Sequence, residues 1–522
     1  MAPETSRRLT LAATILGSSM AYVTAVSVAV PVIGEQFGIG LAGQQWIVLS
    51  YSLALASLYL VAGALGDRLG RRETFVAGTI GFAVASAVAG AAPNAPVLIA
   101  GRVLQGATGA LLTTGSLALL RETFGKESGR AIGLWTAGTG AVSLGGPPLG
   151  GALVEWASWR WIFYLNVPLA VAAVVLARLG SDGRAPARAT TAAIDISGAA
   201  LAAVGIGFLT YALVEGGERG FTSVAWAFAL GLVGLGLFLA RELRASEPLL
   251  PLGLFRNRDF ALVNVTTLLV YSALAGSTFF LVLYLQSVIG YSPFEVGLLL
   301  IPSTLVMLVL APGFGRLGDR YGPRLFLTAG PVAMAAGMLL WIRIDDRTLW
   351  DGLLPGLLLF GLGISMIVAP ITATALRAAP ERYTGVAAGV NSTFSRLGSL
   401  LAIVVLGLVV SLVFAQGTAN PDLVPLGLGQ QGAEFRAAST DAFRAAMLVA
   451  ATIALAGAAV AFWVCKGVAK AEEEPLEGVL PRARLDPASP DCPAPLPHYD
   501  TEPSSPAYQS SIRTAPSSSR TG

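Results

Sequence analysis

Long apolar stretches, separated by short charged or Gly- and Pro-rich breaks, run along most of this 522-residue sequence. A helix needs about 20 apolar residues to cross a bilayer, and about fourteen stretches reach that length. Apolar residues make up 54% of the chain and charged residues only 12%, and the mean hydropathy is +0.69. Because a soluble domain carries about 25% charged residues, this composition excludes a soluble enzyme, a disordered protein and a disulfide scaffold. The sequence predicts an all-α polytopic membrane protein.

The limits of the apolar stretches predict 14 transmembrane helices. They lie near residues 9–33, 43–65, 73–92, 95–119, 129–153, 160–179, 194–214, 222–241, 261–285, 293–314, 324–342, 353–375, 384–414 and 443–464. Cationic loop residues favour the cytoplasm. With the N-terminus inside, 26 of the 34 Lys and Arg residues fall in cytoplasmic segments and 6 in external ones, while Arg102 and Arg396 remain within spans. We therefore expect a multi-pass protein of the cell membrane with both termini in the cytoplasm.

The two ends of the chain differ in composition from the spans. Residues 1–8 form a short cytoplasmic N-terminus, and residues 465–522 are rich in Pro and Ser, which is typical of a disordered tail. The single histidine, His498, and Cys492 lie in this tail, so we expect neither a metal site nor a disulfide. The net charge of +3 is too small to indicate nucleic-acid binding. We expect no cofactor, no nucleic-acid partner and no enzymatic activity, since no catalytic grouping of His, Asp, Glu or Ser falls within the spans.

One eight-residue segment occurs twice. LGDRLGRR at residues 65–72 returns as LGDRYGPR at residues 317–324, with 6 of 8 positions identical. Each copy follows the second span of a block of six when the spans near 194–214 and 222–241 are set aside. This order predicts an N-terminal six-helix bundle at 9–179, two linker helices at 194–241 and a C-terminal six-helix bundle at 261–464. Duplicated halves around a central site are typical of secondary transporters, which expose that site to each side in turn.

The repeated segment places charges at a tight turn that glycine permits. A carboxylate and several guanidiniums there can pair with neighbouring helix ends in one conformation and release them in another. A single basic loop would more simply anchor the chain on the cytoplasmic side, but the duplication favours a gating function. The predicted gating residues are Gly66, Asp67, Arg68, Gly70, Arg71, Arg72, Asp319, Arg320 and Arg324.

Two further features lie within predicted spans. Arg102 falls inside the fourth span, where a guanidinium is costly unless it is paired or faces water. We interpret Arg102 as a functional residue with Gln44 and Gln45 among its partners; the alternative is a structural arginine bonded to backbone carbonyls. Glycines and prolines in the fifth span allow it to bend and to approach another helix closely. These predicted packing residues are Gly146, Pro147, Gly150 and Gly151.

These motifs resemble those of the major facilitator superfamily. The segment GALGDRLGRR at 63–72 resembles its signature loop, and AGRVLQGATGA at 100–110 resembles its fourth-helix motif, in which Arg102 is the functional arginine. GGPPLGG at 145–151 is similar to its fifth-helix antiporter motif. WRWIFYLNVP at 159–168 and EPLLPLGLFR at 247–256 are similar to segments of the fourteen-helix drug:proton antiporter branch.

The resemblance covers residues 9–464. It implies two six-helix bundles around a central cavity, rocking between inward-open and outward-open states, and export driven by protons. It also implies that the face at 145–151 closes the cytoplasmic path against the second half.

The first span departs from that antiporter branch. The branch carries an acid in a stretch that ends in Ala-x-Pro, but residues 20–31 (MAYVTAVSVAVP) hold Tyr22, Thr24 and Ser27 in the corresponding positions. Coupling requires a group that titrates and communicates with the cavity. We therefore expect the boundary acid Glu35, at the outer mouth, to act with Arg102; a solvated loop acid is the simpler alternative. A cavity without a buried anion favours neutral, lipophilic or anionic substrates over organic cations.

The residues predicted to line the substrate path share a polar or aromatic side chain within the spans, although aromatic residues more often face lipid or its interface. They are Tyr22, Thr24, Trp46, Tyr51, Gln105, Tyr271, Tyr284, Gln286, Asn391, Phe394 and Arg396.

The main functional hypothesis is a proton-coupled exporter of small amphipathic compounds, of the multidrug efflux type. One alternative is an exporter or facilitator for a dedicated lipid or metabolite without such coupling, favoured by the missing acid. Another is a membrane receptor or scaffold with the tail as its effector. The expected partners are a small-molecule substrate, a proton and membrane lipids, and the expected state is a monomer.

Overall fold

The computed structural model describes residues 3–23, 26–180, 196–245, 252–380, 383–418, 420 and 422–464. The regular structure of these residues is helical and includes no strand. All the described helices belong to one compact unit. Thr24 and the predicted tail at 465–522, with its histidine and both cysteines, lie outside the described residues.

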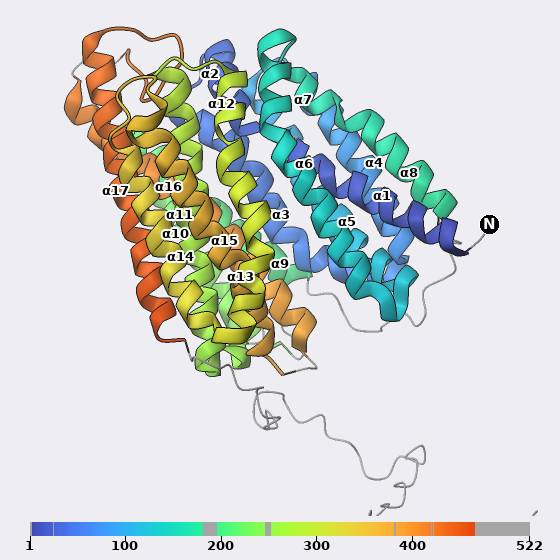
Figure 1. Ribbon diagram of the computed structural model, residues 1–522. Helices are drawn as coiled ribbons and strands as arrows, with labels where there is room; N and C mark the ends of the chain where they lie inside the picture. The colour runs from blue at the N-terminus through green and yellow to red at the C-terminus, as the bar shows by residue number, and fades with distance from the viewer. Residues whose placement is uncertain are drawn as a thin grey trace, which may run out of the picture. The chain divides into compact units, whose positions relative to one another are not determined.

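The first helices form what we term the N-terminal group (Figure 1). They are α1 (Pro3–Val23), α2 (Val26–Phe37), α3 (Leu41–Leu69), α4 (Arg71–Gly90), α5 (Ala95–Phe124), the short 3-10 helix η1 (Gly125–Glu127), α6 (Ser128–Trp156), α7 (Arg160–Tyr164) and α8 (Asn166–Gly180). Two helices follow, α9 (Ile196–Arg219) and α10 (Phe221–Glu242), which pack against each other.

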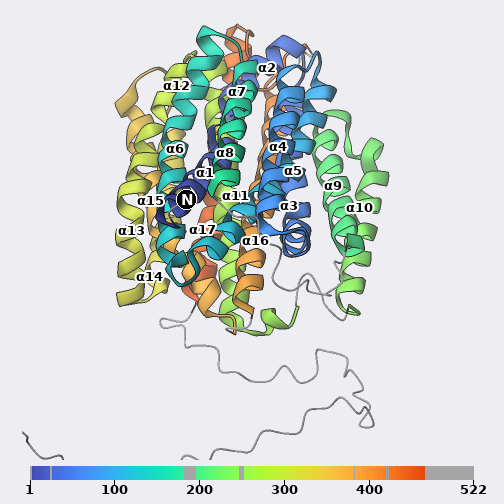
Figure 2. The same ribbon diagram turned by 90° about the vertical axis from the view of Figure 1, so that its right-hand side faces the viewer.

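The last helices form the C-terminal group. They are the 3-10 helix η2 (Leu252–Arg256), α11 (Arg258–Ser287), α12 (Pro293–Leu299), α13 (Ile301–Tyr321), α14 (Pro323–Trp341), the π-helical turn η3 (Leu349–Leu353), α15 (Leu354–Arg377), α16 (Thr384–Gly417) and α17 (Ala433–Phe462). The helix pair α9 and α10 stands beside α3, and α9 also packs against α16 (Figure 2).

Every predicted apolar stretch overlaps at least one helix, but the stretches at 160–179 and 293–314 are interrupted within the described residues. Eleven helical segments of the described chain are long and apolar enough to cross a membrane. Proline explains both interruptions, because it lacks the N–H that would bond four residues back. Pro168 follows the break between α7 and α8, and Pro302 follows the break between α12 and α13.

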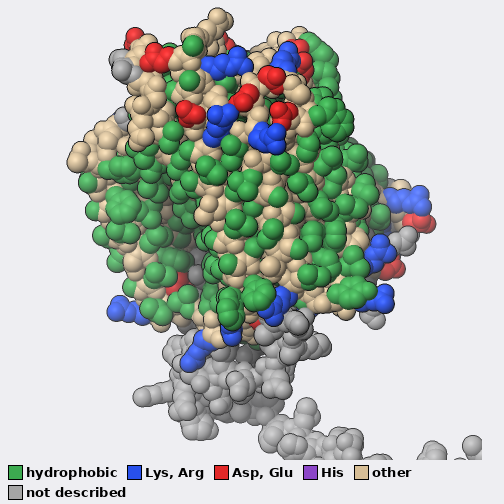
Figure 3. Space-filling view, turned by 60° about the vertical axis from the view of Figure 1, so that its left-hand side comes forward, with side chains coloured by type: hydrophobic (Ala, Val, Ile, Leu, Met, Phe, Trp, Pro, Cys, Tyr) green, Lys and Arg blue, Asp and Glu red, His purple; other side chains and the backbone are tan. Residues whose placement is uncertain are grey.

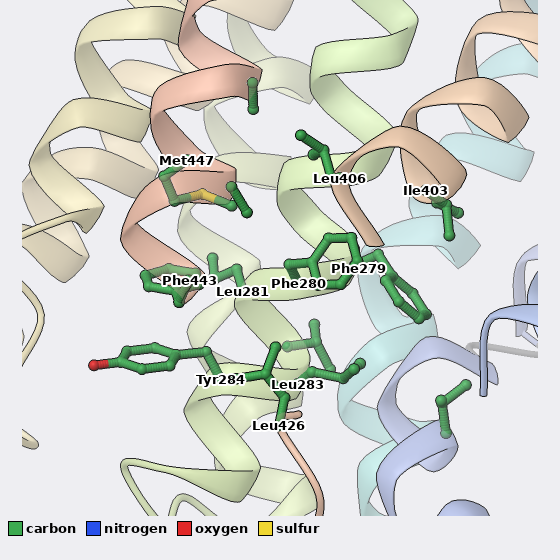
Figure 4. Close-up of a cluster of buried hydrophobic side chains, with 14 of the residues drawn as sticks. Phe279, Phe280, Leu281, Leu283, Tyr284, Ile403, Leu406, Leu426, Phe443 and Met447 are labelled. Carbon is green, nitrogen blue, oxygen red and sulfur yellow. The ribbon is translucent and has the colours of Figure 1, made fainter. Parts of the chain in front are cut away.

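Large apolar side chains fill the core of the C-terminal group (Figure 4). Phe280 of α11 is fully buried, as is Phe443 of α17. The ring of Tyr284 stacks on that of Phe443 with 4.0 Å between centroids. This packing ties α11 to α17 within one group.

The helices run between two ends. The α3–α4 and α13–α14 turns lie at one, which we term the motif end, while α2, α7 and α12 lie at the other, which we term the α2 end (Figures 1 and 2). On the face shown in Figure 3, hydrophobic side chains form a broad band and charged side chains lie at its margins. This distribution matches a hydrocarbon layer between two aqueous phases.

Candidate functional site

The two copies of the repeated segment form equivalent turns. Gly70 separates α3 from α4 with φ +96°, and Gly322 separates α13 from α14 with φ +87°. Residues with a side chain rarely adopt this left-handed backbone conformation, so glycine allows the sharp turn between the two helices of each pair. The duplication in sequence is therefore a duplication in backbone geometry.

The charged residues beside these turns pair within their own helix group. Asp319 accepts a hydrogen bond from Arg377 at the end of α15. Arg71 lies 3.9 Å from Glu122 of α5, and the guanidinium of Arg324 lies 4.0 Å from the ring centroid of Phe462. Exposed pairs of this kind contribute about 0.2–1 kcal/mol each, so they can exchange partners at little cost.

The other predicted gating residues have simpler surroundings. Arg72 bonds its neighbour Glu73 at 2.6 Å, and Arg320 lies over the ring of Tyr321. Gly66 is buried against Thr74. The side chains of Asp67 and Arg68 lie outside the described part of the structure.

Helices α6 and α12 form a close contact between the two groups at the α2 end. A Cβ atom added at Gly151 would lie 2.3 Å from the carbonyl oxygen of Pro293, and one added at Gly297 would lie 2.4 Å from that of Pro147. Gly146 and Gly150 are buried in the same segment. Glycine is required because the two backbones nearly touch.

Two side-chain contacts extend the α6–α12 interface. The rings of Trp156 and Phe294 lie 4.8 Å apart, and the Glu155 carboxylate accepts a hydrogen bond of 3.1 Å from the Phe294 N–H. The segment at 145–151, which was expected to close a path against the second half, thus packs on α12 of the C-terminal group.

Two buried glutamines also bond across the groups. Gln45 of α3 donates to the Ile403 carbonyl of α16 at 2.7 Å, and Gln286 of α11 donates to the Val28 carbonyl of α2 at 2.9 Å. Each glutamine is 3% exposed. Gln286 also lines a cavity of about 330 Å³ beneath the loop at 428–432.

Arg102 lies in a buried cluster within the N-terminal group. Its Nε donates to the Ile47 carbonyl at 3.0 Å, its Nη1 donates to Gln105 Oε1 at 2.8 Å, and its guanidinium lies 4.4 Å from the Tyr51 ring centroid. Gln105 in turn donates to Ser86 Oγ at 2.6 Å. Arg102 is only 5% exposed, so its donors are directed into the protein.

The partners of Arg102 differ from those predicted. Gln45 faces α16 instead, and Gln44 packs against Gly34 of α2. Sequence reasoning missed Ser86, which also accepts a hydrogen bond of 3.2 Å from Asn166 of α8. The signal available was Asn166 itself, a polar residue at the start of an apolar span.

Arg396 of α16 has different surroundings from Arg102. It is partly exposed, and its guanidinium lies 5.3 Å from the ring centroid of Tyr59 on α3. A guanidinium at the centre of a membrane span costs about 2.5–3.5 kcal/mol. A cation–π contact offsets only about 0.5–2 kcal/mol of that. The contact with Tyr59 therefore does not by itself offset the free-energy cost of placing the Arg396 charge in the membrane span.

The other predicted lining residues divide into two sets. Asn391 is buried and donates to Thr267 Oγ1 at 2.8 Å, while Tyr284 is fully buried and donates to the Ile344 carbonyl at 2.8 Å. Tyr271 and Phe394 are partly exposed. The side chain of Tyr22 lies outside the described residues.

Two predicted residues lie near the α2 end. Trp46 donates to Glu215 of α9 at 3.3 Å, and Glu215 pairs with Arg219 at 2.9 Å. Glu35 is exposed and lies against Gly429. Among the described residues, no group of three or more His, Cys, Asp or Glu side chains could hold a metal ion.

These features define a class: a helical, multi-pass membrane protein with two groups of helices and a duplicated charged turn. Residues 11–403 match the family model of the Major Facilitator Superfamily. The chain belongs to this superfamily and is a membrane transporter.

Relatives and solved structures agree with this assignment. The chain is 37% identical to the multidrug resistance protein Stp of Mycobacterium tuberculosis over 80% of this chain and 78% of that protein. It is 35% identical to a tetracenomycin C resistance and export protein of Streptomyces glaucescens over 77% and 76%. A bacterial homologue of the human lysosomal transporter Spinster has the same fold, with a TM-score of 0.64 at 16% identity over 88% of this chain and 97% of that one.

Proposed function

We propose that this protein exports small amphipathic or lipophilic compounds, including drugs, by alternating access. The observation that carries the proposal is the contact of α6 with α12, which joins the two groups at the α2 end. The charged residues at the motif end pair within their own groups instead. The relatives named for multidrug resistance and for export support this substrate class.

The proposal includes a full topology. The chain has 14 transmembrane helices in a six-two-six order, with bundles at 9–179 and 261–464 and linker helices at 194–241. It works as a monomer, and the excess of cationic loop residues places both termini in the cytoplasm. The motif end then faces the cytoplasm, and the structure represents a state closed toward the outside.

The duplicated turns act as gates in this scheme. When the motif end closes, Asp319 and Arg71 exchange their present partners for helix ends of the other group. The present pairs are exposed and weak, so the exchange requires little free energy.

Coupling to protons is assigned to Glu35 and Arg102. Glu35 is accessible from the α2 end, where an exporter takes up protons. Arg102 holds α3 and α5 together through Ile47 and Tyr51. The partly exposed residues Tyr51, Tyr271, Phe394 and Arg396 contact the substrate.

The test uses purified protein in liposomes that contain a pH-sensitive dye. We expect compounds from a drug panel to change the internal pH only in liposomes that contain the protein. Arg102→Ala should abolish transport while expression remains, and Glu35→Gln should abolish only the uphill transport driven by a pH gradient. Wild-type transport by both variants would contradict the coupling assignment.

A second function is favoured by one observation. The first span has no carboxylate in residues 20–31, so the protein could be a facilitator for a dedicated metabolite or lipid. Transport down a gradient with no change in internal pH would support this function over coupled export.

A further inference from the structure

The two arginines within the spans have opposite environments. Arg102 is buried and directs its donors to Ile47 and Gln105. Arg396 is partly exposed, and in the described part of the chain it takes part in no ion pair. Only Arg396 is therefore available to a molecule that enters between the two groups.

Arg396 lies deep within a long helix. Helix α16 spans Thr384–Gly417, so Arg396 is about 18 Å from its first residue and about 31 Å from its last at 1.5 Å per residue. The side chain reaches Tyr59 of α3, which belongs to the other group. The guanidinium thus lies inside the membrane span and at the junction of the two groups.

The helices around Arg396 offer it no central carboxylate. Helix α16 contains no Asp or Glu, and neither does α15. The single acid of α3, Asp67, lies within its last three residues, and that of α11, Asp259, is its second residue. A desolvated guanidinium is stabilised most by an anion with matching geometry, and these helices do not supply one.

We propose that Arg396 and Tyr59 form a binding site for the anionic group of an aromatic substrate. The guanidinium pairs with a carboxylate or phenolate of the ligand, and the Tyr59 ring packs beside the ligand's aromatic system. Neighbouring hydroxyls of Ser392, Ser395 and Ser399 on α16 lie along the same helix. This inference rests on the proposed export function and names its substrate class as aromatic organic anions.

The site also involves both halves of the transporter. Asn391, five residues before Arg396 in α16, is bonded to Thr267 and Asn264 of α11 within the C-terminal group. This bonding fixes α16 against α11, so the position of Arg396 is set by the C-terminal group. Tyr59 comes from the N-terminal group, so the ligand contacts both groups at once.

The experiment measures dye binding to the purified full-length protein in detergent by fluorescence anisotropy. The probes are fluorescein (anionic), Nile red (neutral) and ethidium (cationic) at pH 7.5. We expect Arg396→Gln to weaken fluorescein binding at least tenfold and to change Nile red binding less than twofold. Arg396→Lys should retain part of the fluorescein affinity, because it keeps the charge but loses the bidentate geometry.

A matched control removes the same charge elsewhere. Arg316 is exposed near the end of α13, and its Nε donates a hydrogen bond to the Pro312 carbonyl of its own helix. Arg316→Gln should leave fluorescein binding unchanged. Tyr59→Ala should weaken binding more than Tyr59→Phe, which keeps the ring.

The outcomes separate this inference from the export function. The inference would be overturned if Arg396→Gln lost affinity for all three dyes equally, or if the wild-type protein bound no fluorescein. In either case, transport of any compound in the panel would leave the export function intact. Binding of fluorescein that depends on Arg396, without transport of any compound, would overturn the export function alone. If size-exclusion chromatography shows that Arg396→Gln does not fold, the fluorescein affinities of Arg396→Lys and Tyr59→Ala test the inference instead.

Discussion

The α6–α12 contact makes a quantitative prediction for the substitution Gly151→Ala. The added Cβ would lie 2.3 Å from the Pro293 oxygen and 2.8 Å from the Phe294 Cα. Both are backbone atoms, so no side-chain rotation can relieve the clash. Because carbon–oxygen contacts lie at about 3.3–3.6 Å, the two helices must separate by about 1 Å.

The cost falls only on the state in which α6 and α12 touch. Overpacking of this kind costs about 1–3 kcal/mol, which shifts the equilibrium between the two states by about 5- to 150-fold. A matched control is Gly145→Ala in the same segment, since nothing lies within 4 Å of a Cβ at Gly145. Both variants gain the same helix propensity, about 1 kcal/mol, so their difference isolates the clash.

The assay is pulsed electron paramagnetic resonance with spin labels on the two groups at the α2 end. Suitable sites are Ala157→Cys and Trp350→Cys, both exposed, in a Cys465→Ser, Cys492→Ser background. We expect Gly151→Ala to populate longer distances and Gly145→Ala to match the parent. If both variants gave the parent distribution, the α6–α12 contact would not determine closure of the α2 end, and the argument from Gly151 would fail.

Two further predictions concern buried hydrogen bonds. Ser86→Ala leaves Gln105 and Asn166 without their common acceptor, which should lower the free energy of unfolding by about 1–3 kcal/mol; an unchanged melting temperature in detergent would count against the cluster. Gln45→Met removes the hydrogen-bond donor to Ile403 while keeping a similar side-chain volume. The equilibrium between the two states should therefore shift by about 1 kcal/mol toward separated groups, and the same spin-label pair should show longer distances. A distribution identical to the parent would show that this bond does not hold the groups together.

The positions of the helices and of the two sharp turns could be predicted from the sequence. The length of an apolar stretch locates a membrane helix. Gly70 and Gly322 indicate turns whose backbone conformation only glycine adopts easily. The interruptions at Pro168 and Pro302 also had a signal in the sequence, because proline removes a helix hydrogen bond. Each proline lies within an apolar stretch long enough for one span, so the stretch was assigned to a single uninterrupted helix.

The rotation of each helix about its own axis, which sets the side that packs inward, could not be predicted in the same way. A helix that is apolar all around has no polar face to indicate which side packs inward. Gln44 and Gln45 are neighbours in sequence, yet one packs on Gly34 and the other bonds Ile403. The partners of Arg102 depend on this rotation, and one of them is a backbone carbonyl that no sequence pattern marks.

The internal repeat relates two of the places at which the two groups meet. In the proposed six-two-six order, α6 is the fifth span of the first bundle and α12 begins the second span of the other. The equivalent pair after exchange of the bundles is α3 with α16, and these helices are joined by Gln45 and Ile403. The two contacts are thus related by the repeat but differ in chemistry, since one is a glycine–proline backbone contact and the other is a hydrogen bond from a glutamine side chain to a backbone carbonyl. Because the pseudosymmetry relates which helices meet and not which side chains meet there, the contacts can differ in function: we propose closure at α6–α12 and, elsewhere along α3 and α16, substrate recognition by Arg396 and Tyr59.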